Sequence, residues 1–116
     1  MKIKKKNSEI LTRAEVQKTN YLLKEYCERI ERQVKNQGLL TVHYKAYEKE
    51  GKARKFSINV KLSIPGQMFE ANSSDWDLSR TLHKVLNKIM NEVEHKLHSS
   101  DQHPKTREPQ QKRKRN

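Results

Sequence analysis

Three basic residues spaced four apart are the strongest chemical signal in this sequence. Arg80, Lys84 and Lys88 stand in a segment, Leu78 to Asn91, that contains no acidic residue. In a helix, a spacing of four puts the three side chains on one face, about 6 Å apart along the axis. Such a row can follow phosphate groups, with each cation contacting one or two oxygens. The pattern therefore points to an anionic partner.

Two further residues extend this row. Asn87 adds a neutral hydrogen-bond donor, and His83 adds a side chain that is positive when protonated. The alternative is an ordinary solvated helix face. Solvated faces usually mix charges of both signs, as the predicted helix between Asn20 and Asn36 does. The absence of acids beside Arg80, Lys84 and Lys88 favours a binding role.

The charge of the whole chain agrees with a polyanionic partner, most simply RNA. The 116 residues carry a net charge of +12, and both ends are basic. Basic tails on a basic domain favour polyanion binding through counterion release. The last basic cluster could contact nucleic acid or act as a nuclear import signal, and it consists of Lys112, Arg113, Lys114 and Arg115. The alternative is that the tails only aid solubility.

The apolar pattern predicts an α+β fold with one core. Two amphipathic helices are expected, at Asn20–Asn36 and Asp75–His98. Three alternating strands are expected between them, at Leu39–Tyr47, Arg54–Ile64 and Gln67–Asn72. The natural arrangement is a small sheet with both helices packed on its apolar face.

The boundaries of the domain follow from composition. We expect a basic flexible N-terminus over residues 1–8, a folded domain over 9–98 and a disordered basic tail over 99–116. Ser8–Arg13 could be a short first strand, but Thr12 and Glu15 also fit a capping box that would start a helix. The sequence leaves both possibilities open.

Special residues carry three further expectations. Gly38 should cap the first helix in the left-handed conformation. Trp76 should anchor the start of the second helix against the core. Ser73 to Asp75 should supply the N-cap of that helix.

The sequence offers little for catalysis or for metal and cofactor binding. Cys27 is the only cysteine and falls among apolar helix positions, so we expect a small buried hydrophobe. His95 and His98 lie near two acids but lack further ligands at matching spacing. No glycine-rich phosphate loop or paired catalytic group is present. We expect no enzyme activity, no cofactor, no metal and no small-molecule substrate.

The outer face of the sheet is expected to carry lysines but not to stack bases. Phe56 belongs to the inward set, and Tyr47 alone is best regarded as a surface tyrosine. No segment approaches the ~20 apolar residues that span a bilayer. We therefore expect a cytoplasmic protein without a membrane partner.

From Thr41 to Leu97 the sequence resembles the ribosome hibernation-promoting factors, also called the ribosome-associated inhibitor A or sigma-54 modulation family. The similarity lies in VHYKAYEK, in the alternating KFSINVKLSIPG, and in Asp77, Leu78, Leu82 and Asn87-Lys88-Ile89. The chain departs from the family where its usual Tyr after the helix-start Asp is replaced by Leu78-Ser79. No counterpart of the C-terminal domain by which long members pair ribosomes follows Leu97 in this sequence, so we expect a short form that does not pair ribosomes by its own domain.

The resemblance implies a β–α–β–β–β–α fold like that of double-stranded-RNA-binding domains, with an additional first strand, and so favours a strand at Ser8–Arg13. It implies binding to the small ribosomal subunit, through its rRNA, in the region where mRNA and tRNA lie. Lys88 carries most weight as a contact, then Lys84 and Arg80, with Arg29 and Arg32 on the first helix as weaker candidates.

The leading hypothesis is thus a translation inhibitor that occupies the decoding region and is a monomer away from the ribosome. The alternatives are a general double-stranded-RNA-binding or ribosome-assembly protein, and a regulator whose basic face docks an acidic protein.

Overall fold

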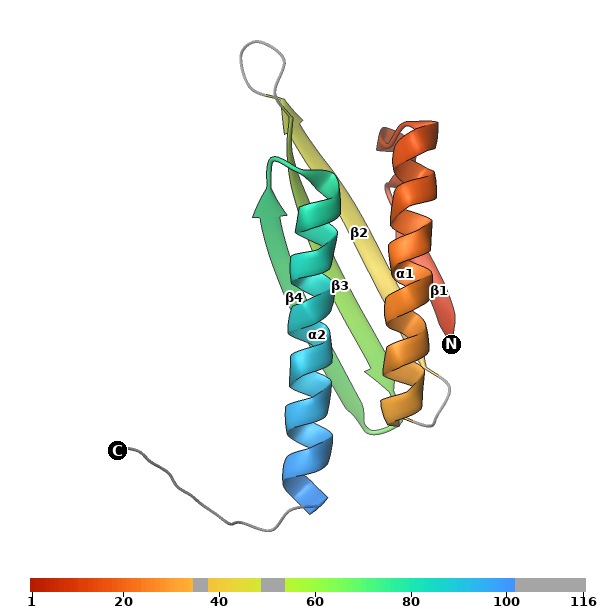
Figure 1. Cartoon of the computed structure of the whole chain (residues 1–116), viewed down its shortest axis with the longest axis vertical. Coiled ribbons are helices and arrows are strands. Elements are labelled where there is room, and N and C mark those ends of the chain that lie inside the picture. The colour runs from red at the N-terminus through yellow and green to blue at the C-terminus, as the bar shows by residue number, and fades with distance from the viewer. Residues whose placement is uncertain (35–37, 49–53, 102–116) are drawn as a thin grey trace, which may run out of the picture.

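A four-stranded sheet carries two long helices on one of its faces (Figure 1). The computed structural model describes residues 1–34, 38–48 and 54–101, with the backbone alone for 98–101. The elements are β1 (Lys2–Lys6), a 3₁₀ turn η1 (Ser8–Ile10), α1 (Arg13–Val34), β2 (Leu39–Glu48), β3 (Arg54–Ile64), β4 (Gln67–Asp75) and α2 (Leu78–Asp101). The predicted α+β fold and its β–α–β–β–β–α order are confirmed.

The strands lie in the order β1-β2-β3-β4. β1 runs parallel to β2, whereas the β2–β3 and β3–β4 pairs are antiparallel. α1 supplies the crossover that a parallel pair requires. The alternation predicted for β3 is confirmed, because Phe56, Ile58, Val60 and Leu62 are all buried and face the helices.

The core lies between the helices and the inner face of the sheet. α2 contributes a stripe that repeats every three or four residues, and α1 contributes a similar one. The fully enclosed side chains include Leu23, Ile30, Leu40, Val42, Ile58, Val60, Leu62, Leu82, Val85, Leu86 and Ile89. This apolar layer fixes which sides of α1 and α2 remain outside.

The start of the chain differs from its prediction. β1 occupies Lys2–Lys6, so the expectation of a flexible segment over residues 1–8 is wrong. All five of its residues are exposed. An edge strand can be held by backbone hydrogen bonds to a single neighbour, so it needs few apolar side chains. That is why the apolar pattern did not reveal β1.

The segment after β1 settles the choice that the sequence left open. The Thr12 N–H donates to Glu15 Oε1 at 2.8 Å, and the Glu15 N–H donates to Thr12 Oγ1 at 3.2 Å. This capping box starts α1 at Arg13, well before the predicted Asn20. The strand expected at Ser8–Arg13 is wrong, and its place is taken by η1.

Two other local predictions fail for structural reasons. Gly38 does not adopt a positive φ; an added Cβ would lie 3.0 Å from the Ser63 carbonyl oxygen, so close packing against β3 favours glycine there. The N-cap of α2 is Asp77, whose Oδ1 accepts the Arg80 N–H at 2.8 Å, and not a residue from Ser73 to Asp75. Pro65 and Gly66 form the turn between β3 and β4, with Gly66 at a φ of 81°.

Candidate nucleic-acid interface

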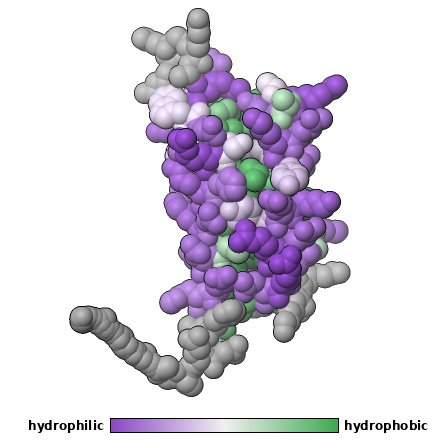
Figure 2. Space-filling model, viewed as in Figure 1, coloured by the Kyte–Doolittle hydropathy of each residue, from purple (hydrophilic) through white to green (hydrophobic). Residues whose placement is uncertain are grey.

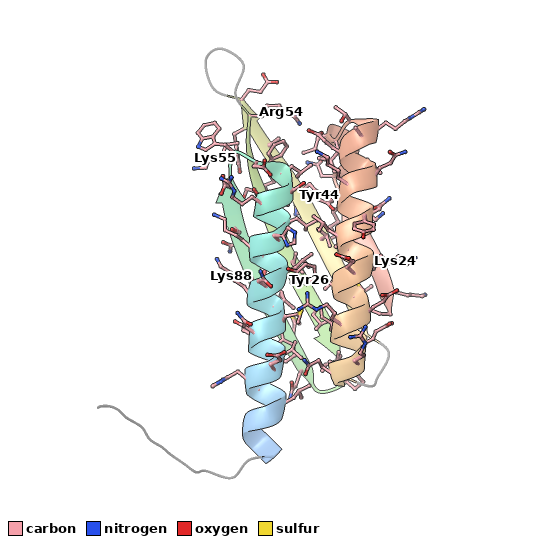
Figure 3. All side chains as sticks on the ribbon, in the orientation of Figure 1. Lys24, Tyr26, Tyr44, Arg54, Lys55 and Lys88 are labelled. Carbon is pink, nitrogen blue, oxygen red and sulfur yellow. The ribbon has the colours of Figure 1, made fainter. Side chains whose placement is uncertain are left out.

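The basic row of α2, namely Arg80, Lys84 and Lys88, is exposed along one side of the helix. Asp77 fixes where α2 begins, and the buried stripe through Leu82 fixes its rotation about its axis. Figure 3 shows Lys88 on the β4 side of α2, away from α1. The predicted one-sided row is therefore present, at the outer edge of the helix layer.

The basic row has an acidic neighbour, Asp75, just before the start of its helix. Lys84 Nζ lies 2.9 Å from Asp75 Oδ2, and Arg80 Nη1 lies 3.7 Å from Asp75 Oδ1. Lys88 Nζ donates to the Asn72 carbonyl oxygen at 2.8 Å. Asp75 ends β4 and is separated from the start of α2 by two residues, and the chain reversal between them brings its carboxylate beside Arg80 and Lys84. One carboxylate thus partly neutralises two of the three cations.

Contacts with Lys84 and Trp76 shift the pKa of Asp75. The hydrogen bond from Lys84 lowers the pKa of Asp75 below its ordinary value of 3.8, and the Trp76 N–H, which donates to Asp75 Oδ1 at 2.6 Å, lowers it further. Because its folded pKa is depressed, Asp75 stabilises the fold above pH 3.8, and this contribution is lost as the pH falls through the folded pKa. At neutral pH the carboxylate competes with any incoming phosphate for Arg80 and Lys84.

Asp75→Asn should therefore separate binding from stability. We expect the variant to bind RNA more tightly at neutral pH, by a few-fold, because Arg80 and Lys84 lose their internal counterion. We expect a lower melting temperature than that of the wild type at pH 7 and no difference in acid, once Asp75 is protonated. Melting curves from pH 2 to 7 and an RNA titration would measure both effects. Weaker binding at pH 7 would contradict the competition.

His83 and Asn87 face α1 and not the basic row. The Tyr26 hydroxyl donates to Asn87 Oδ1 at 3.1 Å and lies 3.0 Å from His83 Nδ1. The hydroxyl has one proton, so when Asn87 takes it, His83 must donate from Nδ1. Figure 3 shows Tyr26 between the two helices. The sequence grouped these residues with the cations, but the structure uses them to join α1 and α2.

Tyr26→Phe tests this junction. The change leaves the amide of Asn87 and the ring nitrogen of His83 without their shared partner; Tyr26 is only 4% exposed, whereas His83 and Asn87 are exposed and can bind water instead. We expect the free energy of unfolding to fall by about 0.5–1.5 kcal/mol, as for the loss of a typical intramolecular hydrogen bond. Chemical denaturation measures it. A Tyr21→Phe control, on an exposed α1 tyrosine, should leave stability unchanged.

The remaining candidates are placed as follows. The Arg29 guanidinium lies 5.2 Å from the centroid of the Tyr26 ring, so it sits at the α1 side of the same junction. Arg32 is exposed on α1. The predicted basic cluster from Lys112 to Arg115 lies outside the described residues. Figure 2 shows that hydrophilic side chains cover both helices on this face, with apolar atoms visible between them.

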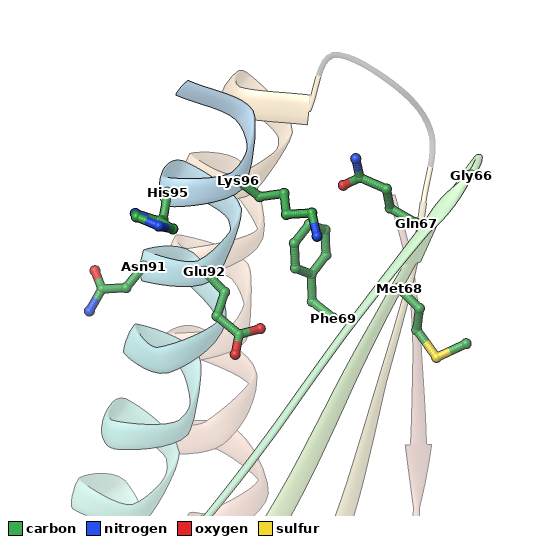
Figure 4. Close-up of a pocket in the computed structure, with 8 residues that line it drawn as sticks. All are labelled: Gly66, Gln67, Met68, Phe69, Asn91, Glu92, His95 and Lys96. Atoms are coloured by element: carbon green, nitrogen blue, oxygen red, sulfur yellow. The ribbon is translucent and has the colours of Figure 1, made fainter. Parts of the chain in front are cut away.

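Other features of the described residues give no sign of catalysis. An open groove of about 770 Å³ lies between β4 and the C-terminal half of α2, where Lys96 reaches over Phe69 and His95 points away (Figure 4). Within residues 1–34, 38–48 and 54–101 no three His, Cys, Asp or Glu side chains come together as a metal site requires. Cys27 is buried, as expected, and this burial, with Glu31 nearby, raises the pKa of its thiol to about 11.

No helix in the described part of the chain has an apolar stretch long enough to cross a membrane. The exposed positions of α2 near the basic row are polar or charged.

Comparisons with known proteins identify the fold. No family model and no curated protein sequence matches the chain. Among solved structures, the N-terminal domain of Thermus thermophilus protein Y matches 81% of this chain and 93% of its own, with 18% identity and a TM-score of 0.60. The chain has the protein Y fold. A ribosomal subunit interface protein from Coxiella burnetii also matches, over 83% of this chain and 97% of its own, with 13% identity and a TM-score of 0.62.

These matches bear on the resemblance noted in the sequence. They confirm the implied architecture, including a first strand before α1 that pairs with β2, although that strand is Lys2–Lys6. The two solved chains are covered almost to their full length, so the chain corresponds to the whole of each matched domain. At these identities the likeness concerns the fold.

Proposed function

We propose that this protein binds the small ribosomal subunit through its rRNA and inhibits translation by occupying the decoding region. The basic row of α2 would contact phosphates, and the shape of the helix layer would select the site. Binding would exclude mRNA and tRNA sterically, as in a hibernating ribosome, with no chemical step. The protein would act in the cytoplasm, as a monomer when off the ribosome.

One observation carries the proposal. Three exposed cations lie in a row on the outer side of α2, in a fold shared with a protein named for the ribosomal subunit interface. Lys88 is the strongest candidate within the row, because its only described partner is a backbone carbonyl oxygen, that of Asn72. A phosphate can replace that neutral acceptor more easily than it can displace the Asp75 carboxylate from Lys84.

Sedimentation tests the proposal directly. Purified protein is mixed with ribosomes and their separated subunits, and run on a sucrose gradient at physiological salt with a short RNA duplex as competitor. We expect migration with the small subunit that resists the duplex, and inhibition of initiation in a reconstituted translation assay. Release by the duplex would instead support general double-stranded-RNA binding. A complex that survives RNase would support an acidic protein partner.

A further inference from the structure

The side of the sheet that α1 and α2 leave uncovered is a second basic surface, here called the open face. Cross-strand partners share a face, so the register assigns its residues. Tyr44 and Ile58 are partners on the helix side, and the positions that alternate with them lie on the open face. Its charged residues are Lys2, Lys4, Lys6, Lys45, Lys55, Lys61 and Glu70.

The open face is therefore more one-sided in charge than the helix side. It carries six lysines and one glutamate, and its other strand positions are mainly Ser, Thr and Asn. Within the described part of the chain, none of the six lysines forms an ion pair. On the helix side, by contrast, Arg54 pairs with Glu15 and Lys84 pairs with Asp75. These unpaired lysines favour the binding of a polyanion.

Aromatic rings stand at one end of the open face. Tyr47 is directly opposite Lys55 across the β2–β3 pair. The Lys55 amine lies 5.8 Å from the centroid of the Trp76 ring, which follows the end of β4. The two aromatic residues are 53% and 49% exposed, so each has a ring available to a partner. Trp76 is thus not the core anchor that the sequence predicted.

The three side chains form an aromatic–basic–aromatic row across three strands. With strands about 4.8 Å apart, Tyr47 and Trp76 are separated by roughly 10 Å, with Lys55 between them. Two bases could stack on the rings while the amine of Lys55 binds the phosphate that links them. Lys45, one pleat further along β2 on the same face, continues the positive track.

We propose that the open face binds single-stranded RNA, independently of the basic row on α2. Exposed aromatic rings contribute little to the binding of a duplex, because its bases are already stacked on one another. Unpaired bases, by contrast, can stack on Tyr47 and Trp76. The lysines then hold the backbone in a sequence-tolerant way. Phe56 is buried as the sequence predicted, but Trp76 supplies the stacking residue that this prediction lacked.

The chain provides its own reporter, because Trp76 is its only tryptophan. Titration with the unstructured oligonucleotide U12 should quench the fluorescence of Trp76. In parallel, the anisotropy of fluorescein-labelled U12 gives an affinity for variants that lack the indole. Trp76→Ala should weaken binding between about fivefold and a hundredfold, the range for one stacked base. Tyr47→Ala should weaken it within the same range.

Two triple variants separate this surface from the proposed ribosome contact. Changing Lys6, Lys45 and Lys55 together to Gln should reduce the slope of log affinity for U12 against log salt concentration by about 2. Changing the basic row of α2 to Gln should leave U12 binding unchanged. Circular dichroism of each variant checks that the fold persists, as expected because none of the changed side chains is buried.

Several results would overturn the inference. They are an absence of quenching at physiological salt, equal competition by a 12-base-pair RNA duplex or by polyglutamate, and U12 binding that depends on the α2 row but not on the open face. Failure of ribosome sedimentation with U12 binding intact would instead count against the proposed function alone.

Discussion

Replacing Arg80, Lys84 and Lys88 together by glutamine should remove the protein from the ribosome fraction of a sucrose gradient while it stays folded. If each exposed phosphate contact is worth about 1 kcal/mol, the loss is on the order of a hundredfold in affinity. The slope of log ribosome affinity against log salt concentration should also become shallower by about 2. Glutamine is preferred to glutamate because three new acids beside Asp75 would add repulsion unrelated to RNA.

A matched control removes the same charge elsewhere. Arg13, Lys18 and Lys24 are exposed on α1, and Figure 3 shows Lys24 on the side of α1 remote from α2. Their triple glutamine variant has the same net charge as the α2 variant. It should retain most ribosome binding. Equal loss in both variants would mean that total charge, and not the row on α2, determines binding, and the site assignment would then be wrong.

The core of the fold was predictable because its signals are periodic. Alternation placed Ile58 and Val60 in the sheet interior, and spacings of three and four placed Leu82 and Leu86 on the inner side of α2. The basic row was predictable for the same reason, since a helix turned by its apolar stripe presents its i, i+4 cations together. A local periodic pattern therefore predicts well which side chains are buried and which are exposed.

Other features depend on contacts that no local pattern contains. β1 is an edge strand made almost wholly of lysine, so it lacks an apolar period. Tyr26 meets His83 only when α1 packs beside α2, and Asp75 meets Lys84 only because the chain reverses between β4 and α2 and does not continue as one helix. The position of the first strand, which begins six residues before the predicted Ser8–Arg13, was also hidden, because Lys2–Lys6 reads as a solubilising tail by composition alone.

The exposure of Trp76 could not be predicted from its residue type. The sequence prediction treated a lone tryptophan at a helix start as an anchor for the core. Large apolar residues are also common at surfaces, so burial does not follow from residue type. The described structure leaves Trp76 49% exposed beside Lys55, where it serves the open face and not the interior. Exposed aromatics in this chain are therefore better read together with their cross-strand neighbours.

Leu86→Ala is expected to have the largest effect on stability. Leu86 is completely buried on α2, in the apolar layer that holds this helix on the sheet. Truncation should lower the free energy of unfolding by about 2–5 kcal/mol, through lost transfer energy and the cavity left behind. In a domain of this size the melting temperature should then fall by roughly 10 °C or more. Calorimetry or thermal denaturation followed by circular dichroism measures the shift.

The same substitution also tests whether the basic row acts as a rigid unit. Leu86 touches no exposed surface, so a folded Leu86→Ala protein should bind ribosomes normally at low temperature and lose binding only as it unfolds. Leu86→Met preserves the volume and should cost less than about 1.5 kcal/mol, which separates the cavity from the substitution itself. If Leu86→Ala weakened binding far below its melting temperature, the position of α2 on the sheet would have to differ between the free and the bound protein.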